Sequence, residues 1–174
     1  MQREKSPNLE KLFYRKWAGL LVWALIVGLF LAPASVSAAD DASPPSKPAM
    51  SLEEMTLAKV RMKIKANKYE SAIPMLMDVV MANPRNADAH NLLGYSYRKL
   101  GRYPEASQAY LKALEIDPDH KGALEYQGEL FLKLGQLYKA EQNLNRLSAL
   151  CWFGCEEHTD LKKAIAAYKA KGGS

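Results

Sequence analysis

The pattern of apolar and polar residues divides the chain into three parts. Residues 17–32 form an apolar run that follows basic residues such as Lys11 and Lys16. Residues 39–50 are polar and rich in proline. From residue 52 to residue 150 there is no strand-like alternation, and apolar residues recur at helical spacing among many Ala, Leu, Lys and Glu. The pattern predicts an all-α domain preceded by a segment of different character.

The helical part repeats itself with a period of 34 residues. Ala72, Ala106 and Ala140 are each 34 residues apart, and so are the residues at the preceding turn. Four other columns of similar residues, the turn column included, keep this spacing. The columns are Asn67, Gly101 and Gly135; Tyr69, Tyr103 and Leu137; Leu76, Tyr110 and Leu144; and Val79, Ala113 and Leu147.

Each unit has the features of a helical hairpin. Gly94 and Ala106 are small, which lets two antiparallel helices approach closely, and Tyr97 and Tyr110 fill the space beside them. Gly101 allows the left-handed turn that ends the first helix. One hairpin cannot bury its own faces, so neighbouring units are expected to stack.

Residues 87–120 closely resemble the tetratricopeptide repeat. The residues that carry the resemblance are Leu93, Gly94, Tyr97, Gly101, Ala106, Tyr110, Ala113 and Pro118. Residues 121–154 resemble the repeat through Gly128, Phe131, Gly135, Ala140, Leu144 and Leu147, but Trp152 replaces the terminal proline, which indicates that the array is ending.

Residues 53–86 match the repeat only in their second half. The strict register puts Lys59 and Lys63 at apolar positions, whereas a shift of one residue recovers Leu57, Val60 and Ile64. The shift predicts a shortened turn in the first hairpin.

The resemblance implies a short right-handed α-solenoid. We expect about three helix-turn-helix repeats over residues 51–150, then a joint and a capping helix over residues 151–174. The cap is predicted from Glu156 to Lys171, where apolar residues share one face and lysines point away. Open stacks need such a lid with a polar outer face to stay soluble.

The N-terminal part is typical of an export signal. Basic residues, the apolar run and the small residues before Ala39 predict a signal peptide over residues 1–38 with cleavage after Ala38, followed by a linker over residues 39–50. The alternative is an uncleaved anchor in the inner membrane, although the run is shorter than the roughly 20 residues a membrane-spanning helix needs. The domain is expected in the periplasm in either case, with membrane contact only through a retained signal.

Charge and motifs exclude several functions. The net charge of +5 falls to 19 Lys and Arg against 17 Asp and Glu after residue 38, so we expect no nucleic-acid partner. There is no Ser/His/Asp arrangement, no glycine-rich phosphate loop and no carboxylate pair set against a base. The sequence predicts no enzyme and no cofactor.

The two cysteines, Cys151 and Cys155, lie at the joint before the capping helix. An oxidising compartment favours a disulfide between them, which would fix how the cap meets the stack. Three alternatives stay open. With His158 the reduced thiols form a soft ligand set for copper(I) or zinc, the pair can be redox-active, or both thiols are inert.

The resemblance also implies a binding surface on the first helices of the repeats. The corresponding columns hold Asn91, Tyr95, Arg98, Glu125, Glu129 and Leu132. This mixed polar and aromatic set predicts a groove for a segment of a partner protein that is exported or membrane-bound. The expected function is a protein-binding scaffold in the bacterial envelope. The alternatives are a metal- or thiol-handling accessory protein that uses Cys151, Cys155 and His158, and a component that self-associates through the ends of the stack.

Overall fold

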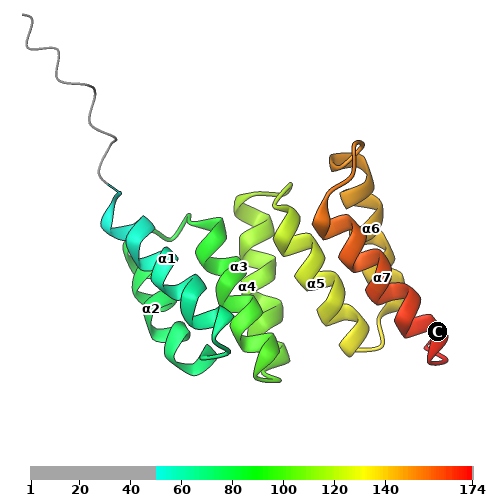
Figure 1. The fold of residues 1–174 in the computed structure, drawn as a ribbon, viewed down its shortest axis with the longest axis horizontal. Coiled ribbons are helices and arrows are strands. Elements are labelled where there is room, and N and C mark those ends of the chain that lie inside the picture. Colours follow the sequence, from blue (N-terminus) through cyan, green and yellow to red (C-terminus); the bar gives the residue numbers. More distant parts are fainter. Residues whose placement is uncertain (1–49, 174) are drawn as a thin grey trace, which may run out of the picture. The chain divides into compact units, whose positions relative to one another are not determined.

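The computed structural model describes residues 50–173, and every regular element within them is an α-helix (Figure 1). This confirms the expected all-α class. The predicted signal segment over residues 1–38 and the linker as far as residue 49 lie outside the described residues. The helices are α1 (Leu52–Lys65), α2 (Tyr69–Ala82), α3 (Ala87–Lys99), α4 (Tyr103–Ile116), α5 (Lys121–Lys133), α6 (Leu137–Leu150) and α7 (Glu156–Ala170).

The described residues form three helical hairpins, α1 with α2, α3 with α4 and α5 with α6. The two helices within each hairpin are joined by a turn, and the three turns have the same length. Each turn has three residues, and its middle residue has a positive φ: 56° at Asn67, 74° at Gly101 and 71° at Gly135. Asparagine and glycine adopt this left-handed conformation more easily than other residues. The prediction of a shortened first turn is therefore wrong.

The first hairpin differs from the others in the face that α1 buries. Leu57 and Val60 are buried and Ile64 packs against the same core, as the shifted register predicts. Helix α1 is the first of the described helices and packs mainly against α2. It buries only the side that faces its neighbour, so Lys59 can lie exposed in a column that holds Leu93 in the next unit.

The two helices of the second hairpin approach each other closely at Gly94. A Cβ atom on Gly94 would lie 2.6 Å from the ring of Tyr110, which is fully buried. Only glycine fits there without a shift of the ring. The small residue and the tyrosine that the sequence pairs across the hairpin are therefore in direct contact.

Helix α7 takes the place that the first helix of a fourth unit would have. It begins 35 residues after α5, which itself begins 34 residues after α3, and it packs on both α5 and α6. Leu161 of α7 is fully buried, and a Cβ atom on Gly128 would lie 2.6 Å from its side chain. The outward face of α7 carries the exposed lysines Lys162, Lys163 and Lys169.

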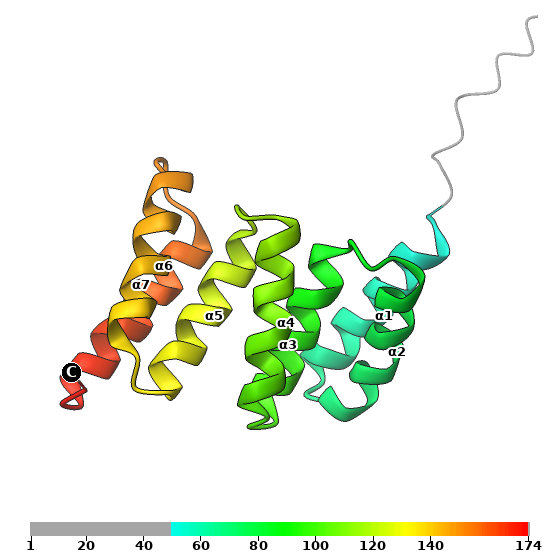
Figure 2. The ribbon, with the colours of Figure 1, turned by 180° about the vertical axis from the view of Figure 1, so that it is seen from behind.

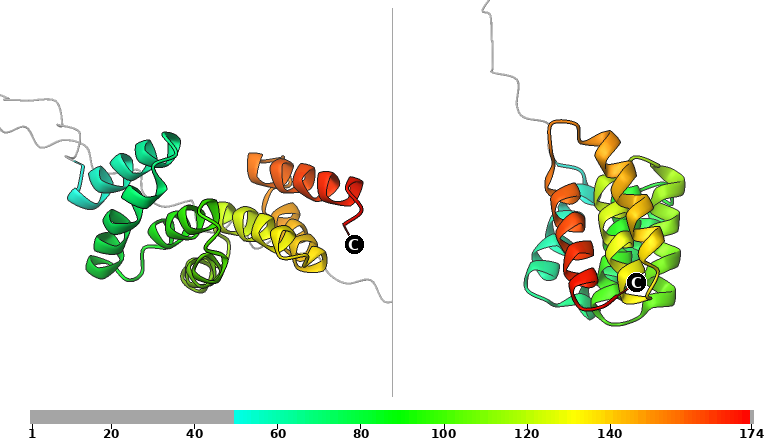
Figure 3. Two further views of the ribbon diagram at one scale, coloured as in Figure 1. Left: turned by 90° about the horizontal axis from the view of Figure 1, so that it is seen from below. Right: turned by 90° about the vertical axis from the view of Figure 1, so that its right-hand side faces the viewer.

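The first helices of the units and the second helices form two rows. Figure 1 shows α1, α3, α5 and α7 on the near side, and Figure 2 shows α2, α4 and α6 from behind. In the left panel of Figure 3, α1 and α7 rise at the two ends on the same side of α3 and α5. None of the described helices is long and apolar enough to span a membrane.

Candidate functional site

The row of first helices forms a groove, by which we mean the surface of α3, α5 and α7 that contains two cavities. The acidic cavity, of about 310 Å³, lies at the N-terminal ends of these helices, and the basic cavity, of about 590 Å³, lies at their C-terminal ends. The acidic cavity is lined by Arg61, Asp88, Asn91, Leu92, Gly122, Glu125, Tyr126, Glu156, Glu157 and Asp160. The basic cavity is lined by Arg98, Lys99, Glu129, Leu132, Lys133, Ala164, Ala167, Tyr168 and Lys171.

Tyrosine rings connect the helices of the groove. The ring of Tyr95 on α3 lies 6.2 Å from that of Tyr69 on α2 and 4.8 Å from that of Tyr126 on α5, measured between ring centroids. The guanidinium of Arg98 lies over Tyr95 and Tyr126, at 5.3 Å and 5.7 Å from their ring centroids. These are the distances of favourable aromatic and cation–π contacts. The rings of Tyr95 and Tyr126 lie in contact between the two cavities, and we call this pair the tyrosine floor.

Arg98 is held inside the protein. Its guanidinium forms an ion pair with Glu129 at 2.6 Å, its Nε donates a hydrogen bond to the Tyr110 hydroxyl at 3.3 Å, and its side chain is only 9% exposed. Burial raises the pKa of the Tyr110 hydroxyl, which therefore stays neutral and can accept this bond. Arg98 is mainly a structural residue that joins α3, α4 and α5.

Glu125 is the most unusual ionisable group in the groove. Its residue is 7% exposed, and burial, followed by the negative charges of Glu129, Asp160 and Glu157, raises the pKa of its carboxyl to about 8. The nearby Arg98 offsets this only in part. A buried carboxyl surrounded by other carboxylates favours the neutral form, or a cation beside it.

Asp88, at the edge of the acidic cavity, already has its cations. Arg61 forms an ion pair with it at 2.7 Å, and Nε2 of His120 lies 3.0 Å from its other oxygen. The hydrogen bond from His120, with help from Arg61, lowers the pKa of the Asp88 carboxyl. The Nδ1 atom of His120 accepts the Ala123 backbone N–H, so this histidine also caps α5.

The structure brings the six sequence-predicted groove residues onto one surface. Asn91 and Glu125 line the acidic cavity, and Arg98, Glu129 and Leu132 line the basic one. Tyr95 lies between them, in contact with Tyr126 and Arg98. Asn91, Glu125 and Leu132 are buried, so they form the base of the groove rather than its rim.

Helix α7 contributes to both cavities, although its sequence predicted only a capping helix. Glu156, Glu157 and Asp160 line the acidic cavity, and Tyr168 and Lys171 line the basic one. The available signal was the 35-residue offset from α5, which puts Asp160 in the same column as the groove residue Glu125. Asp88, Tyr126 and the neighbouring Lys99 and Lys133 were also not predicted as groove residues.

The joint between α6 and α7 contains the two cysteines. Their sulfur atoms are 2.12 Å apart, which is bonding distance. His158 lies beside Ser148, with 2.9 Å between its Nε2 and the hydroxyl oxygen. Within residues 50–173 no three His, Cys, Asp or Glu side chains are grouped closely enough to hold a metal ion. The turn between the cysteines exposes Trp152 and Phe153, whose rings lie 4.1 Å apart.

Two sequence models of one family match the chain. Both describe the tetratricopeptide repeat, and they cover residues 87–120 and 109–142. Residues 87–142 of this chain therefore contain tetratricopeptide repeats. The matches include α3 to α5, which are the repeat helices that carry the tyrosine floor and most of the groove.

Solved structures show the same repeat fold. The Yersinia enterocolitica type III secretion chaperone SycD, in complex with a peptide of the translocator YopD, is 19% identical, with a TM-score of 0.62 over 73% of this chain and 99% of SycD. PcrH in complex with the chaperone binding region of PopD is 23% identical, with a TM-score of 0.58 over 68% of this chain and 92% of PcrH. The TPR2B domain of yeast Sti1, in a complex with pHsp70, is 16% identical, with a TM-score of 0.61 over 68% of this chain and 97% of the domain. No curated protein sequence matches the chain.

Proposed function

We propose that this repeat protein is a non-enzymatic scaffold that docks a segment of another protein in its groove. The observation that carries the proposal is the groove itself. Two cavities, separated by a tyrosine floor, line up along α3, α5 and α7 and offer buried polar and aromatic side chains to a ligand. Such a mixed surface suits an extended or helical segment, whose side chains can enter successive cavities.

The solved structures support the proposal. SycD was solved with a translocator peptide, PcrH with a chaperone binding region, and the TPR2B domain of Sti1 in a complex with pHsp70. These are partners of those proteins. For this chain they support a protein segment as the class of ligand. The side chains of its own groove then determine which partner sequence binds.

The proposed place of action is the bacterial envelope, which rests on the predicted signal over residues 1–38. The partner is then an exported or membrane-bound protein. Separation of the cell into cytoplasm, membranes and periplasm, followed by mass measurement of the chain in each fraction, tests this part. A mature chain that begins at Ala39 supports it, and an intact chain found only in the cytoplasm contradicts it.

Site-specific photocrosslinking tests the docking surface. A benzophenone amino acid is placed at Glu157 in the acidic cavity, at Lys133 in the basic cavity and, as a control, at the exposed Gln108 on α4. We expect the two groove positions to give one shared crosslinked protein that the control position does not give. Equal crosslinking at all three positions, or none, would contradict the assignment of the groove.

The cysteine alternative requires free thiols, whereas the sulfur atoms are at bonding distance. A mass measurement without reductant is the check. Loss of two hydrogens at Cys151 and Cys155 supports a disulfide that fixes the joint. Two free thiols together with a bound metal ion would instead support a metal-handling role.

A further inference from the structure

We propose that the acidic cavity binds a lysine or arginine side chain of the partner segment. The inference rests on the proposed docking function and adds the chemistry that the partner must have.

The cavity has more carboxylates than cations. Five carboxylates line it against one guanidinium, that of Arg61, and this guanidinium is already paired with Asp88. Asp160 has an exposed partner in Lys163, at 3.2 Å. The other three carboxylates, those of Glu125, Glu156 and Glu157, form no salt bridge with any described residue.

The polarity of the helices explains only part of this charge. Glu156 and Glu157 lie in the first turn of α7, where the helix dipole favours a negative charge without any ligand. Glu125 lies in the second turn of α5, where the dipole effect has faded, and its residue is 7% exposed. A carboxyl that is both buried and near other carboxylates is costly unless a cation accompanies it.

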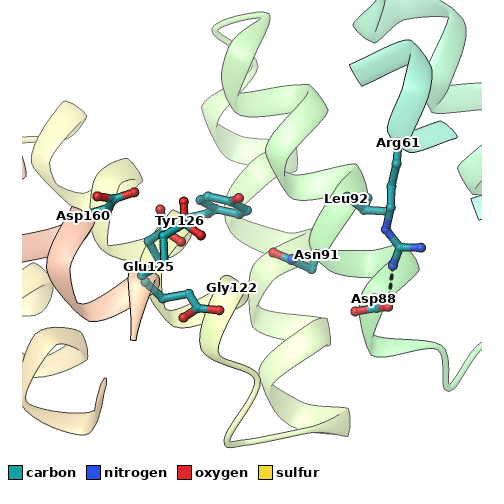
Figure 4. Close-up of a pocket in the computed structure, with 10 residues that line it drawn as sticks. Arg61, Asp88, Asn91, Leu92, Gly122, Glu125, Tyr126 and Asp160 are labelled. Atoms are coloured by element: carbon teal, nitrogen blue, oxygen red, sulfur yellow. Dashed lines mark hydrogen bonds and ion pairs between the residues drawn. The ribbon is translucent and has the colours of Figure 1, made fainter. Parts of the chain in front are cut away.

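Asn91 supplies the second, independent observation. Its residue is 6% exposed, and its Oδ1 atom is buried without a hydrogen-bond partner among the described residues. Figure 4 shows this side chain between Leu92 and the side of the cavity formed by Glu125 and Tyr126, with the oxygen turned toward α5. Buried polar atoms are almost always bonded in native proteins, so an acceptor left open beside a cavity points to a donor that comes with the ligand.

The missing ligand group must therefore donate hydrogen bonds and carry positive charge. Lys and Arg side chains do both, with three and five N–H donors respectively. Leu92 can cover the aliphatic stem of such a side chain, and the ring of Tyr126 offers its face to the charge. A bare metal ion suits the cavity less well, because within the described residues no three acidic or histidine side chains are grouped at ligating distance.

Selection from a peptide library tests the inference on the full-length chain. The probe is a phage-displayed library of random peptides about twelve residues long, which is long enough to span a groove of this kind. We expect the selected peptides to share a Lys or Arg at one position. Selected peptides with no basic position would overturn this inference and leave the docking function standing. Recovery of no peptide would overturn both.

Variants of the chain then locate the basic side chain. Replacing the shared Lys or Arg of a selected peptide by norleucine should weaken its binding at least about tenfold, the size expected for a charged hydrogen bond. In a chain carrying Glu125→Gln the same change in the peptide should reduce the affinity much less. The matched control is Glu115→Gln, on α4 and outside both cavities, which should leave the full loss in place. An equal loss in the wild-type chain and in Glu125→Gln would overturn the assignment to this cavity.

Asn91→Leu provides a second test that does not alter a charge. It removes the open acceptor while keeping a side chain of similar size. It should therefore weaken the binding of basic peptides more than the binding of their norleucine counterparts. Helicity and thermal unfolding of the variant show whether it folds. Equal weakening of both peptides by a folded variant would overturn the role of Asn91.

Discussion

The two cavities of the groove are built from the same helices, yet they differ in which charges are already satisfied. In the basic cavity the buried cation, Arg98, is paired with Glu129 and Tyr110, and the lysines around it are exposed. In the acidic cavity two buried groups lack partners among the described residues. Glu125 forms no salt bridge, and the Oδ1 atom of Asn91 accepts no hydrogen bond. The structural difference lies in burial without partners rather than in the sign of the charge.

This contrast assigns different roles to the two ends. Exposed lysines attract an acidic region of a partner at long range but contribute little to affinity, because water and salt screen them. Buried groups without partners gain most when a ligand supplies the missing donor. We therefore expect the acidic cavity to determine affinity and sequence preference, and the basic cavity to determine the rate and direction of docking.

The largest expected effect is that of Gly94→Ala, which tests the packing of Tyr110 beneath Arg98 in the basic cavity. The new Cβ atom would lie 2.6 Å from the buried Tyr110 ring, whose hydroxyl holds Arg98. Overpacking of this kind lowers the free energy of unfolding by about 1–3 kcal/mol. Urea denaturation measures the loss. Gln108→Ala, at an exposed position of α4, is the control and should change stability by less than about 0.5 kcal/mol.

Arg98→Met separates structure from binding in the basic cavity. The variant loses the bond to Tyr110 and leaves Glu129 without its cation, so we expect the free energy of unfolding to fall by about 2 kcal/mol. Lys133→Met, at an exposed position of the same cavity, should leave it nearly unchanged. Equal stability of both variants would show that the basic cavity has no paired, structural cation.

Glu125→Gln tests the acidic cavity through the pH dependence of stability. The pKa of Glu125 is raised to about 8 from its usual 4.5, because it is buried and faces Glu129 on α5 and Asp160 and Glu157 on α7, with Arg98 on α3 opposing. Between these two pH values the folded chain keeps a proton that the unfolded chain has lost. The contribution of Glu125 to stability therefore falls as pH rises.

The expected result is a difference between wild type and variant that grows with pH. Thermal unfolding should give similar Tm values near pH 5 and a Tm a few degrees higher for Glu125→Gln near pH 8. Comparing the two chains removes the contribution of groups that titrate in both, such as His120. A constant difference across this range would show that Glu125 is not buried among uncompensated charges.

The smallest expected effect is that of Lys99→Gln together with Lys133→Gln. Both lysines are exposed, so stability should change by less than about 0.5 kcal/mol. Stopped-flow binding of a selected peptide with an acidic residue should show slower association and a weaker salt dependence, with little change in dissociation. A large change in dissociation would place affinity in the basic cavity and reverse the comparison.

The sequence predicted the helices of the three hairpins because they depend on the 34-residue period. Small residues at Gly94 and Ala106 and positive-φ residues at Asn67, Gly101 and Gly135 mark the hairpins. The groove residues Asn91, Tyr95 and Glu125 came from the resemblance to the tetratricopeptide repeat, whose first helices carry the binding surface.

Two features could not be read from the period. Helix α7 lies beyond the last complete unit and is offset by one residue, so its acidic side chains were assigned to a capping helix and not to the groove. The burial of Arg98 and the missing partner of Asn91 depend on which side chains meet across three helices. Repeat spacing places a residue on a face, but does not say whether a neighbouring helix satisfies it.

Titration of Glu125 tests the central claim most directly. The carboxyl carbon of Glu125 can be followed by NMR in the full-length chain, free and saturated with a selected peptide. We expect a pKa of about 8 in the free chain, and a clear fall when a basic side chain enters the cavity and favours the charged form. An unchanged pKa at saturation would contradict the account, because the peptide would then be bound with the acidic cavity empty.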